Sequence, residues 1–145
     1  MFVSDILHKK GSKVFSMYPT AQVGKALKEM DARSIGAVVV VDAKGTVKGV
    51  VSERDIVQHL ARRGTTVLDD PLSALMPSKV HTRSPDADVA DIMSLMTYQR
   101  LRHVPIVENG QLRGLISIGD VVKQRLEDME LEVGVLRDVA RISAH

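Results

Sequence analysis

Two serine–aspartate pairs are the residues whose types and spacing could do chemistry. Ser52 stands three residues before Asp55, and Ser117 stands three residues before Asp120; a glycine and two apolar residues precede each serine. Ser-x-x-Asp is a helix-capping signal, because the serine accepts from first-turn amides and the aspartate favours the positive helix end. An aspartate placed there can also accept both hydroxyls of a ribose while free amides face an anion. Since the element occurs twice, binding is at least as well supported as capping alone, and the two roles are compatible.

The residue types and their spacing give little support for a catalytic site or a metal-binding site. The absence of cysteine excludes disulfides, thiolate metal sites and a thiol nucleophile. There is no Gly-x-x-x-x-Gly-Lys phosphate loop and no nucleophile elbow, and neither serine has a His–Asp partner indicated by spacing. No metal-ligand spacing relates the five histidines, which are His8, His59, His81, His103 and His145. We therefore predict a protein that is not an enzyme and holds no metal.

Composition narrows the class of protein further. The 145 residues suffice for one compact domain or two small, closely joined ones. A net charge of +2 and an aromatic content of 3% argue against a nucleic-acid site, which needs clustered positive charge and rings for base stacking. The longest apolar run without glycine, Ala37–Val41, is far shorter than the roughly 20 residues of a membrane helix. The N-terminus lacks the pattern of a signal peptide, so we expect a cytoplasmic protein.

The chain also repeats itself. The segment Pro19–Val23 matches Pro85–Val89, 66 residues later, and the apolar positions that follow recur with the i, i+3, i+4, i+7 spacing of one helix face. The strand-like run that begins at Val38 recurs from Val104 at the same offset. One residue is then deleted, and the Gly-apolar-apolar-Ser-x-x-Asp elements stand 65 residues apart. This agreement over many ordered positions indicates a duplicated unit.

Each unit is predicted to form a strand, a helix, two strands and a second helix. In the first unit the expected elements are a strand at Val14–Ser16, a helix at Thr20–Arg33, hairpin strands at Ala37–Val41 and Val47–Ser52, and a helix at Glu53–Arg63. In the second unit Asn109-Gly110 predicts the hairpin turn. Because a sheet with helices on one side must bury its other face, the two units are expected to cover each other with pseudo-twofold symmetry. The fold class is therefore α/β (α+β), with two tandem β-α-β-β-α repeats plus a C-terminal helix.

This organisation sets the expected domain boundaries. They are a lead-in helix at 1–13, the first repeat at 14–64, a connector at 65–79, the second repeat at 80–125 and a C-terminal helical extension at 126–145. Within the connector, Leu72–Met76 is similar to Val3–Leu7, so the lead-in is expected to be duplicated as well.

The extension carries a heptad pattern. Apolar residues spaced alternately four and three apart form a seam that comprises Val122, Leu126, Met129, Val133, Leu136 and Ala140. Acidic residues, among them Glu127 and Glu130, make the rest of the segment polar. One interpretation is that this helix packs on its own domain. We favour pairing across a homodimer, although Gly134 would weaken the helix.

Taken together, these features resemble a tandem pair of cystathionine-β-synthase-type (CBS) domains, also called a Bateman module. The resemblance rests on the order of the units, the repeated Gly-apolar-apolar-Ser-x-x-Asp ending and the strand Arg102–Val107, and it covers about Ser4 to Arg125. The segments Asp5–Gly11 and Ser52–Val57 are similar to small stand-alone bacterial members. The resemblance implies an adenosine ligand in each of two clefts, with the ribose-binding aspartate from one repeat and the adenine-contacting strand start from the other.

The resemblance carries these roles to particular residues. The first cleft would comprise Ser52, Asp55, Val80, Leu101, Arg102, His103 and Pro105, and the second Ser117, Asp120, Val14, Ile35, Gly36, Ala37 and Val38. The first cleft has Arg102 and His103 where the second has only Gly36 and Ala37. A ligand phosphate should therefore suit the first cleft better. The second repeat also has Gly119 in the place of Arg54, which removes another cation.

The sequence thus predicts a regulatory ligand-binding module for signal transduction or energy sensing. AMP is the expected ligand, with ATP, NAD(H) and S-adenosylmethionine as alternatives, and no catalytic cofactor is expected. An unknown effector protein, or the homodimer itself, would read the bound state. The alternative is an interaction subunit with vestigial clefts, which the aspartate in both repeats disfavours. A minor third reading, nucleic-acid association marked by strong salt dependence, would use Arg62, Arg63, Arg100, Arg102 and Arg113.

Overall fold

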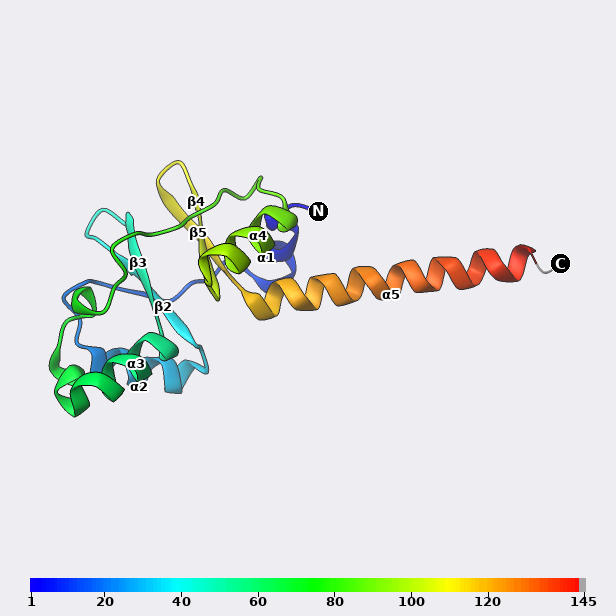
Figure 1. Cartoon of the computed structure of the whole chain (residues 1–145). Helices are drawn as coiled ribbons and strands as arrows, with labels where there is room; N and C mark the ends of the chain where they lie inside the picture. Colours follow the sequence, from blue (N-terminus) through cyan, green and yellow to red (C-terminus); the bar gives the residue numbers. More distant parts are fainter. Residues whose placement is uncertain (144–145) are drawn as a thin grey trace.

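The computed structural model describes residues 1–143 as two lobes and one long helix. The elements are α1 (Val3–Lys10), β1 (Ser16–Met17), α2 (Val23–Arg33), β2 (Ala37–Val41), β3 (Val47–Ser52), α3 (Glu53–Arg63), the 3-10 helices η1 (Gly64–Asp69) and η2 (Leu72–Ala74), α4 (Val89–Gln99), β4 (His103–Glu108), β5 (Gln111–Ser117) and α5 (Ile118–Ser143). Figure 1 shows α2, α3 and the β2–β3 hairpin in one lobe, α1, α4 and the β4–β5 hairpin in the other, and α5 leaving the second lobe as a rod. The predicted mixed α/β class is confirmed.

The first repeat is built on a three-stranded sheet. Strand β1 pairs in parallel with β2, and β2 pairs antiparallel with β3. The side chains of Val38, Val39 and Val40 are all fully buried, so β2 is covered on both faces. This explains its continuous run of β-branched residues, since a strand buried on both faces does not alternate between apolar and polar. Met30 of α2 and Ile56 of α3 complete the core of this lobe.

The second repeat uses a shorter version of the same plan. Strands β4 and β5 form an antiparallel hairpin, and both residues of its turn, Asn109 and Gly110, have positive φ (52° and 75°). A two-residue hairpin turn needs this backbone conformation, as the Asn-Gly pair predicted. The counterpart of β1 is a single parallel bridge between Arg83 and Ile106. The Arg83 amide donates to the Pro105 carbonyl at 3.2 Å, and the Val107 amide donates to the Arg83 carbonyl at 2.8 Å.

Two predicted boundaries in the first repeat are shifted. Strand β1 comprises Ser16–Met17 instead of Val14–Ser16, and α2 begins at Val23 instead of Thr20. The helix starts later because Gln22 forms a β-bridge with Pro71 and the Val23 amide donates to the Asp70 carbonyl at 2.9 Å. These partners belong to the connector, nearly 50 residues away in the chain, so the sequence around the helix could not reveal them.

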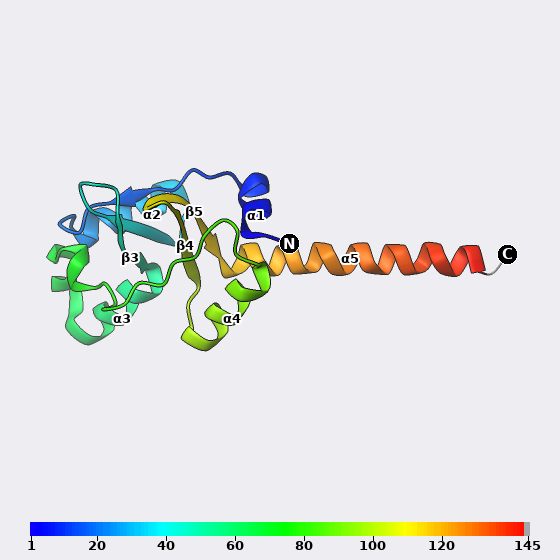
Figure 2. The same ribbon diagram turned by 90° about the horizontal axis from the view of Figure 1, so that it is seen from above.

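The lead-in segments cross between the repeats. Helix α1 precedes the first repeat, but its Val3, Ile6 and Leu7 are buried in the core of the second repeat. The connector precedes the second repeat, yet Leu72 and Leu75 are buried in the core of the first. Figure 2 shows α1 beside the start of α5, in the second lobe. Each repeat is therefore completed by a segment that lies outside its expected boundaries.

The glycine of each Gly-apolar-apolar-Ser-x-x-Asp element lies under one of these crossed segments. A Cβ on Gly114 would lie only 2.5 Å from Cδ2 of Leu7, and a Cβ on Gly49 would lie 3.2 Å from Cε of Met76. Both glycines are buried. Any side chain at Gly114 would overlap that of Leu7 unless one of them moved. The packing of the crossed segments thus requires glycine at this position.

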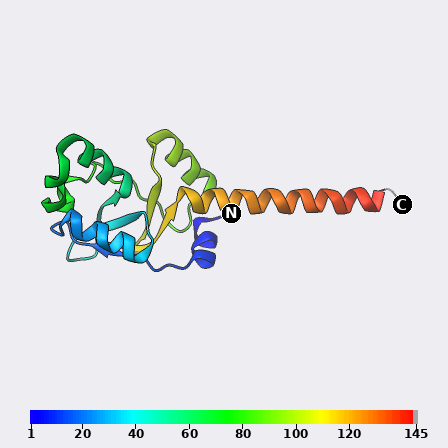
Figure 3. The ribbon, with the colours of Figure 1, turned by 90° about the horizontal axis from the view of Figure 1, so that it is seen from below.

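Helix α5 runs without interruption through the boundary expected between residues 125 and 126. Only its base is buried, through Val121 and Gln124, and its C-terminal end lies far from both lobes (Figure 1, Figure 3). The interpretation that the whole helix packs on its own domain is therefore wrong beyond its first turns. Residues 144 and 145 of the expected extension lie outside the described residues. None of the helices in residues 1–143 has the length and apolar character needed to cross a membrane.

Candidate functional site

Both Ser-x-x-Asp elements form capping boxes at helix starts. The Asp55 amide donates to Ser52 Oγ at 3.2 Å, and the Ser52 amide donates to Asp55 Oδ2 at 2.9 Å. The corresponding bonds in the second repeat measure 3.1 Å from the Asp120 amide to Ser117 Oγ and 2.8 Å from the Ser117 amide to Asp120 Oδ2. The predicted capping role is therefore confirmed. The capping bonds use one oxygen of each carboxylate, Oδ2, so capping still permits Oδ1 to accept bonds from a ligand.

The larger cleft lies between the two repeats, beside the start of α3. Its volume is about 610 Å³, within the usual range for small-molecule sites. The structure places five of the predicted residues around it: Ser52, Asp55, Leu101, Arg102 and His103. The first two belong to the first repeat and the other three to the second. A ligand in this cleft would therefore contact both repeats at once.

Two other residues predicted for the first cleft lie beside it. Val80 and Pro105 line an adjoining pocket of about 50 Å³. This pocket shares Leu101 and His103 with the larger cleft. Val80 is 38% exposed, whereas Pro105 is buried within β4. The two residues thus extend one wall of the site without surrounding its main volume.

The second cleft is smaller, at about 330 Å³, and also combines both repeats. Of the residues predicted for it, the lining includes Ser117, Val14, Ile35, Gly36 and Ala37. The lining does not include Val38, whose side chain is fully buried in the core of the first repeat. This burial follows from the position of Val38 in a strand that is covered on both faces.

Asp120, which was predicted for the second cleft, is not among its lining residues and instead lines a neighbouring pocket of about 160 Å³ that shares Lys10 with the cleft. Its carboxylate is already engaged by the protein. Lys10 Nζ donates to Asp120 Oδ2 at 2.5 Å and to the Leu115 carbonyl at 2.7 Å. Burial acts to raise the pKa of Asp120, but the bonds from Lys10 and Ser117 outweigh it and hold this pKa below its usual value. A ribose hydroxyl at Asp120 would have to share the carboxylate with Lys10. The two aspartates are therefore not equivalent.

His103 borders both clefts. Burial lowers its pKa, and the positive charges of Lys10 and Arg102 act in the same direction, against Asp120 and Asp55. Burial and the two cations therefore favour the neutral form of the imidazole, and the two carboxylates oppose this effect. An anion bound in either cleft would change the electrostatic surroundings of this one side chain.

The structure adds three cations that sequence reasoning did not assign to a cleft. Arg100 lines the first cleft together with Arg102 and Arg54, the further cation noted in the sequence, whereas Lys10 and Lys13 line the second cleft. The repeat offset relates Arg100 to Ser34, and both residues end a helix with a φ of 54°. That correspondence could have placed Arg100 at the cleft. Lys10 and Lys13 precede the first repeat, and only the crossed lead-in brings them to the second cleft.

Comparison with known proteins assigns this architecture to a family. The family model described as the CBS domain matches residues 3–62 and again residues 72–127. The crystal structure of a CBS-domain containing protein from Agrobacterium tumefaciens is similar, with 43% sequence identity and a TM-score of 0.82 over 86% of this chain and 99% of that one.

Two more distant structures share the fold and were solved with ligands. One is a CBS domain pair in complex with 5′-methylthioadenosine and S-adenosyl-L-methionine, at 20% identity and a TM-score of 0.78 over 88% of this chain and 98% of that one. The other is CBSX2 in complex with AMP, at 22% identity and a TM-score of 0.71 over the same shares of the two chains. The two matched units, the crossed packing and the cleft between them lead to one conclusion: this chain belongs to the CBS domain family and contains a tandem pair of these domains.

Proposed function

We propose that this protein is a non-catalytic regulatory module that binds an adenine nucleotide, with AMP as the expected ligand, in the first cleft. The observation that carries the proposal is the lining of that cleft. It combines the Asp55 carboxylate with three arginines, Arg54, Arg100 and Arg102. The nucleosides and nucleotide bound by the two distant relatives also contain adenosine, which supports this class of ligand.

The chemistry of the cleft fits the parts of a nucleotide. Asp55 Oδ1 would accept from the ribose hydroxyls, since Oδ2 is held by the capping box. Arginine is suited to phosphate because its planar guanidinium donates several parallel hydrogen bonds. Leu101 and Val50 add apolar surface to the same cleft, against which a base could pack. ATP, NAD(H) and S-adenosylmethionine remain alternative ligands of the same site.

Adenylates should raise the melting temperature of the protein. A ligand bound only by the folded state stabilises it by mass action, by about 2.7 kcal/mol at a hundred times its Kd. Differential scanning fluorimetry of nucleotide-free protein with AMP, ATP, NADH and S-adenosylmethionine measures this shift and ranks the ligands. GMP serves as the matched control, because it has the same phosphate and ribose but a different base. If no adenylate shifts the transition at millimolar concentration, the sensor function is wrong and an interaction subunit with vestigial clefts takes its place.

The proposal extends to a cytoplasmic homodimer that presents its bound state to an effector protein. The exposed seam of α5 supports the homodimer, because Leu126, Met129 and Leu136 are each at least 50% exposed in the single chain. Such a run of apolar side chains on one helix face indicates an interaction surface.

Removing α5 from Glu127 onward should weaken self-association and leave the paired repeats folded. The truncated chain keeps Val121 and Gln124, the buried residues at the helix base, so the core of the second repeat stays intact. Light scattering is expected to show a dimer for the full chain and a monomer for the truncated one. Circular dichroism should still show a cooperative thermal transition. An unchanged oligomer after truncation would place the interface elsewhere.

A further inference from the structure

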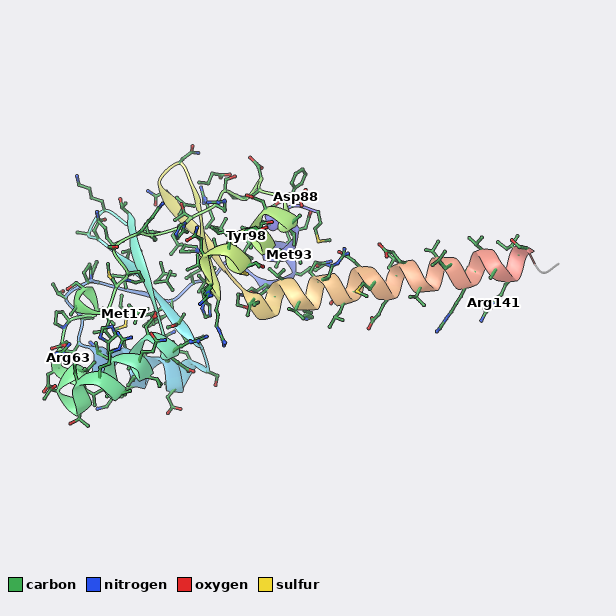
Figure 4. All side chains as sticks on the ribbon, in the orientation of Figure 1. Met17, Arg63, Asp88, Met93, Tyr98 and Arg141 are labelled. Atoms are coloured by element: carbon green, nitrogen blue, oxygen red, sulfur yellow. The ribbon has the colours of Figure 1, made fainter. Side chains whose placement is uncertain are left out.

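Within residues 1–143, most of helix α5 is held to the rest of the protein only at its base, where Lys9 Nζ pairs with Glu127 Oε2 at 3.4 Å. The part from Leu126 to Ser143 is about 27 Å long at 1.5 Å per residue, and every residue in it except Asp128 and Gly134 is exposed. In proteins most of the stability of a helix comes from packing of its apolar face, and a glycine inside a helix weakens it. Figure 4 shows side chains standing free around the rod, with Arg141 near its far end. A partner is therefore needed to keep this segment helical.

The seam faces away from the lobe to which α5 belongs. At 3.6 residues per turn, Val122 and Leu126 of the seam lie roughly 100–160° around the helix from the buried side chains of Val121 and Gln124. The face that continues from those buried residues is broken by Asp128 and Asp138. A shorter apolar run, Leu131, Val135, Val139 and Ile142, lies on that side of the C-terminal half of α5. The seam is the longer apolar stripe, because it continues without a charged residue from Val122 to Ala140.

The charges beside the seam identify the occupant. In heptad notation Leu126, Val133 and Ala140 take the a positions, and Val122, Met129 and Leu136 take the d positions. The flanking residues are Lys123, Glu130 and Arg137 at e, and Arg125 and Glu132 at g. In a parallel pair of these helices, each g residue faces the e residue of the next heptad on the other chain. Arg125 would then face a glutamate, and Glu132 would face an arginine.

An antiparallel pair of the same helices would bring like charges together. There e positions face e positions and g positions face g positions. With the seams in full overlap, Glu130 would lie opposite Glu130, and Lys123 would lie opposite Arg137. The charge pattern thus complements a second copy of the same helix in one orientation only.

We propose that α5 forms a parallel, two-stranded coiled coil with α5 of a second copy. In it Arg125 pairs with Glu130 of the partner subunit, and Glu132 pairs with Arg137 of the partner subunit. The twofold symmetry of such a dimer makes each pair occur twice. This inference rests on the proposed homodimer and adds its orientation and the residues that specify it. It places both pairs of nucleotide clefts at the same end of the coiled coil, where one effector could contact both.

Disulfide trapping tests the orientation in the full-length chain. The chain contains no cysteine, so Leu136→Cys introduces a single thiol at a d position. In the parallel dimer the two Cys side chains adjoin, and mild oxidation should convert most of the protein to a covalent dimer. In the antiparallel dimer they would lie about 15 Å apart, beyond the reach of a disulfide. The matched control is Asp138→Cys, which lies outside the seam and should cross-link poorly. Cross-linking of the control alone, or of neither variant in a protein that still dimerises, overturns the parallel seam.

Charge reversal tests the ion pairs. Glu130→Arg or Arg125→Glu alone should raise the dimer Kd roughly four- to thirtyfold, because two attractive pairs become repulsive. The double variant Arg125→Glu/Glu130→Arg should return to within about threefold of wild type, since the swapped charges again attract. Asp138→Arg changes the net charge as much as Glu130→Arg does and should leave the Kd unchanged.

The outcomes separate this inference from the proposed function. The parallel two-stranded coil is overturned if the double variant dimerises as weakly as the single variants. It is also overturned if light scattering gives the wild type a mass of three or four chains. In both cases the protein still self-associates. A wild-type monomer overturns the homodimer itself. Adenylate binding, measured by calorimetry on the same variants, should be unchanged, because the substituted residues lie outside both clefts.

Discussion

Replacing Asp55 with alanine is expected to weaken AMP binding by roughly ten- to a hundredfold. The carboxylate lines the larger cleft, and its loss would remove the hydrogen bonds proposed for the ribose hydroxyls. Calorimetric titration measures the change in Kd. Because Asp55 also caps α3, Asp55→Asn should be measured beside it: the amide keeps an acceptor for the Ser52 amide but removes the charge. Glu53→Ala is the matched control, since it removes an exposed carboxylate from the same helix turn.

Asp120→Ala, the equivalent substitution in the second repeat, should weaken the binding of an anionic ligand less than Asp55→Ala does. Asp120 shares its carboxylate with Lys10, and the cleft beside it has about half the volume of the first. Asp120→Ala should therefore change the Kd of AMP at the first cleft by less than about threefold. If Asp120→Ala alone removes AMP binding, the order of the two clefts is reversed.

Comparison of AMP with adenosine isolates the phosphate contact. Arg102→Ala should weaken AMP much more than adenosine, because adenosine has no phosphate to lose. Arg113→Ala is a suitable control, since Arg113 lies on β5 outside both clefts and pairs with Glu108. Equal weakening of the two ligands by Arg102→Ala would show that Arg102 does not contact the phosphate.

Replacing Leu7 with alanine is expected to lower the free energy of unfolding by about 2–5 kcal/mol. This is the second large effect, and it comes from a residue that precedes both repeats. Leu7 is only 7% exposed and packs in the core of the second repeat with Ile116 and Val104. Its truncation would leave a cavity there. Urea denaturation measures the change, and His8→Ala, at an exposed position of the same helix, should alter stability by less than about 0.5 kcal/mol.

Gly114 should show strong coupling to Leu7. Gly114→Ala places a methyl group against Cδ2 of Leu7 and should cost about 1–3 kcal/mol by overpacking. In the Leu7→Ala background the same methyl group has room. The loss in free energy of unfolding caused by Gly114→Ala should therefore fall close to zero. The double-mutant cycle measures this difference directly. Additive effects would mean that α1 does not pack on β5 as described.

Local pattern was sufficient for most of the secondary structure. The ranges Ala37–Val41, Val47–Ser52 and Glu53–Arg63 agree with the predicted elements to the residue. They were predictable because β-branched runs, a turn and a Ser-x-x-Asp cap act over a few residues each. The duplication then indicated two similar units, and the resemblance to CBS domains supplied the cleft residues expected in each.

Several details of the fold and the site could not be predicted from the sequence. The burial of Val38 and the late start of α2 at Val23 both depend on which surfaces the rest of the chain covers. Lys10 lies 110 residues from Asp120, and nothing in either segment indicates the ion pair between them. His103 was predicted for one cleft and borders two.

The sequence by itself determined the repeat, the helix caps, the hairpins and the heptad seam, because each depends on the order of neighbouring residues. The tertiary structure alone decided that each lead-in segment completes the opposite repeat, that Gly114 must accommodate Leu7, and that Lys10 reaches Asp120. The physical reason is that these contacts join segments that lie from about 50 to 110 residues apart in the chain. Such segments meet only because the apolar faces of both repeats must be covered at the same time, and many pairings of apolar residues are compatible with the local pattern.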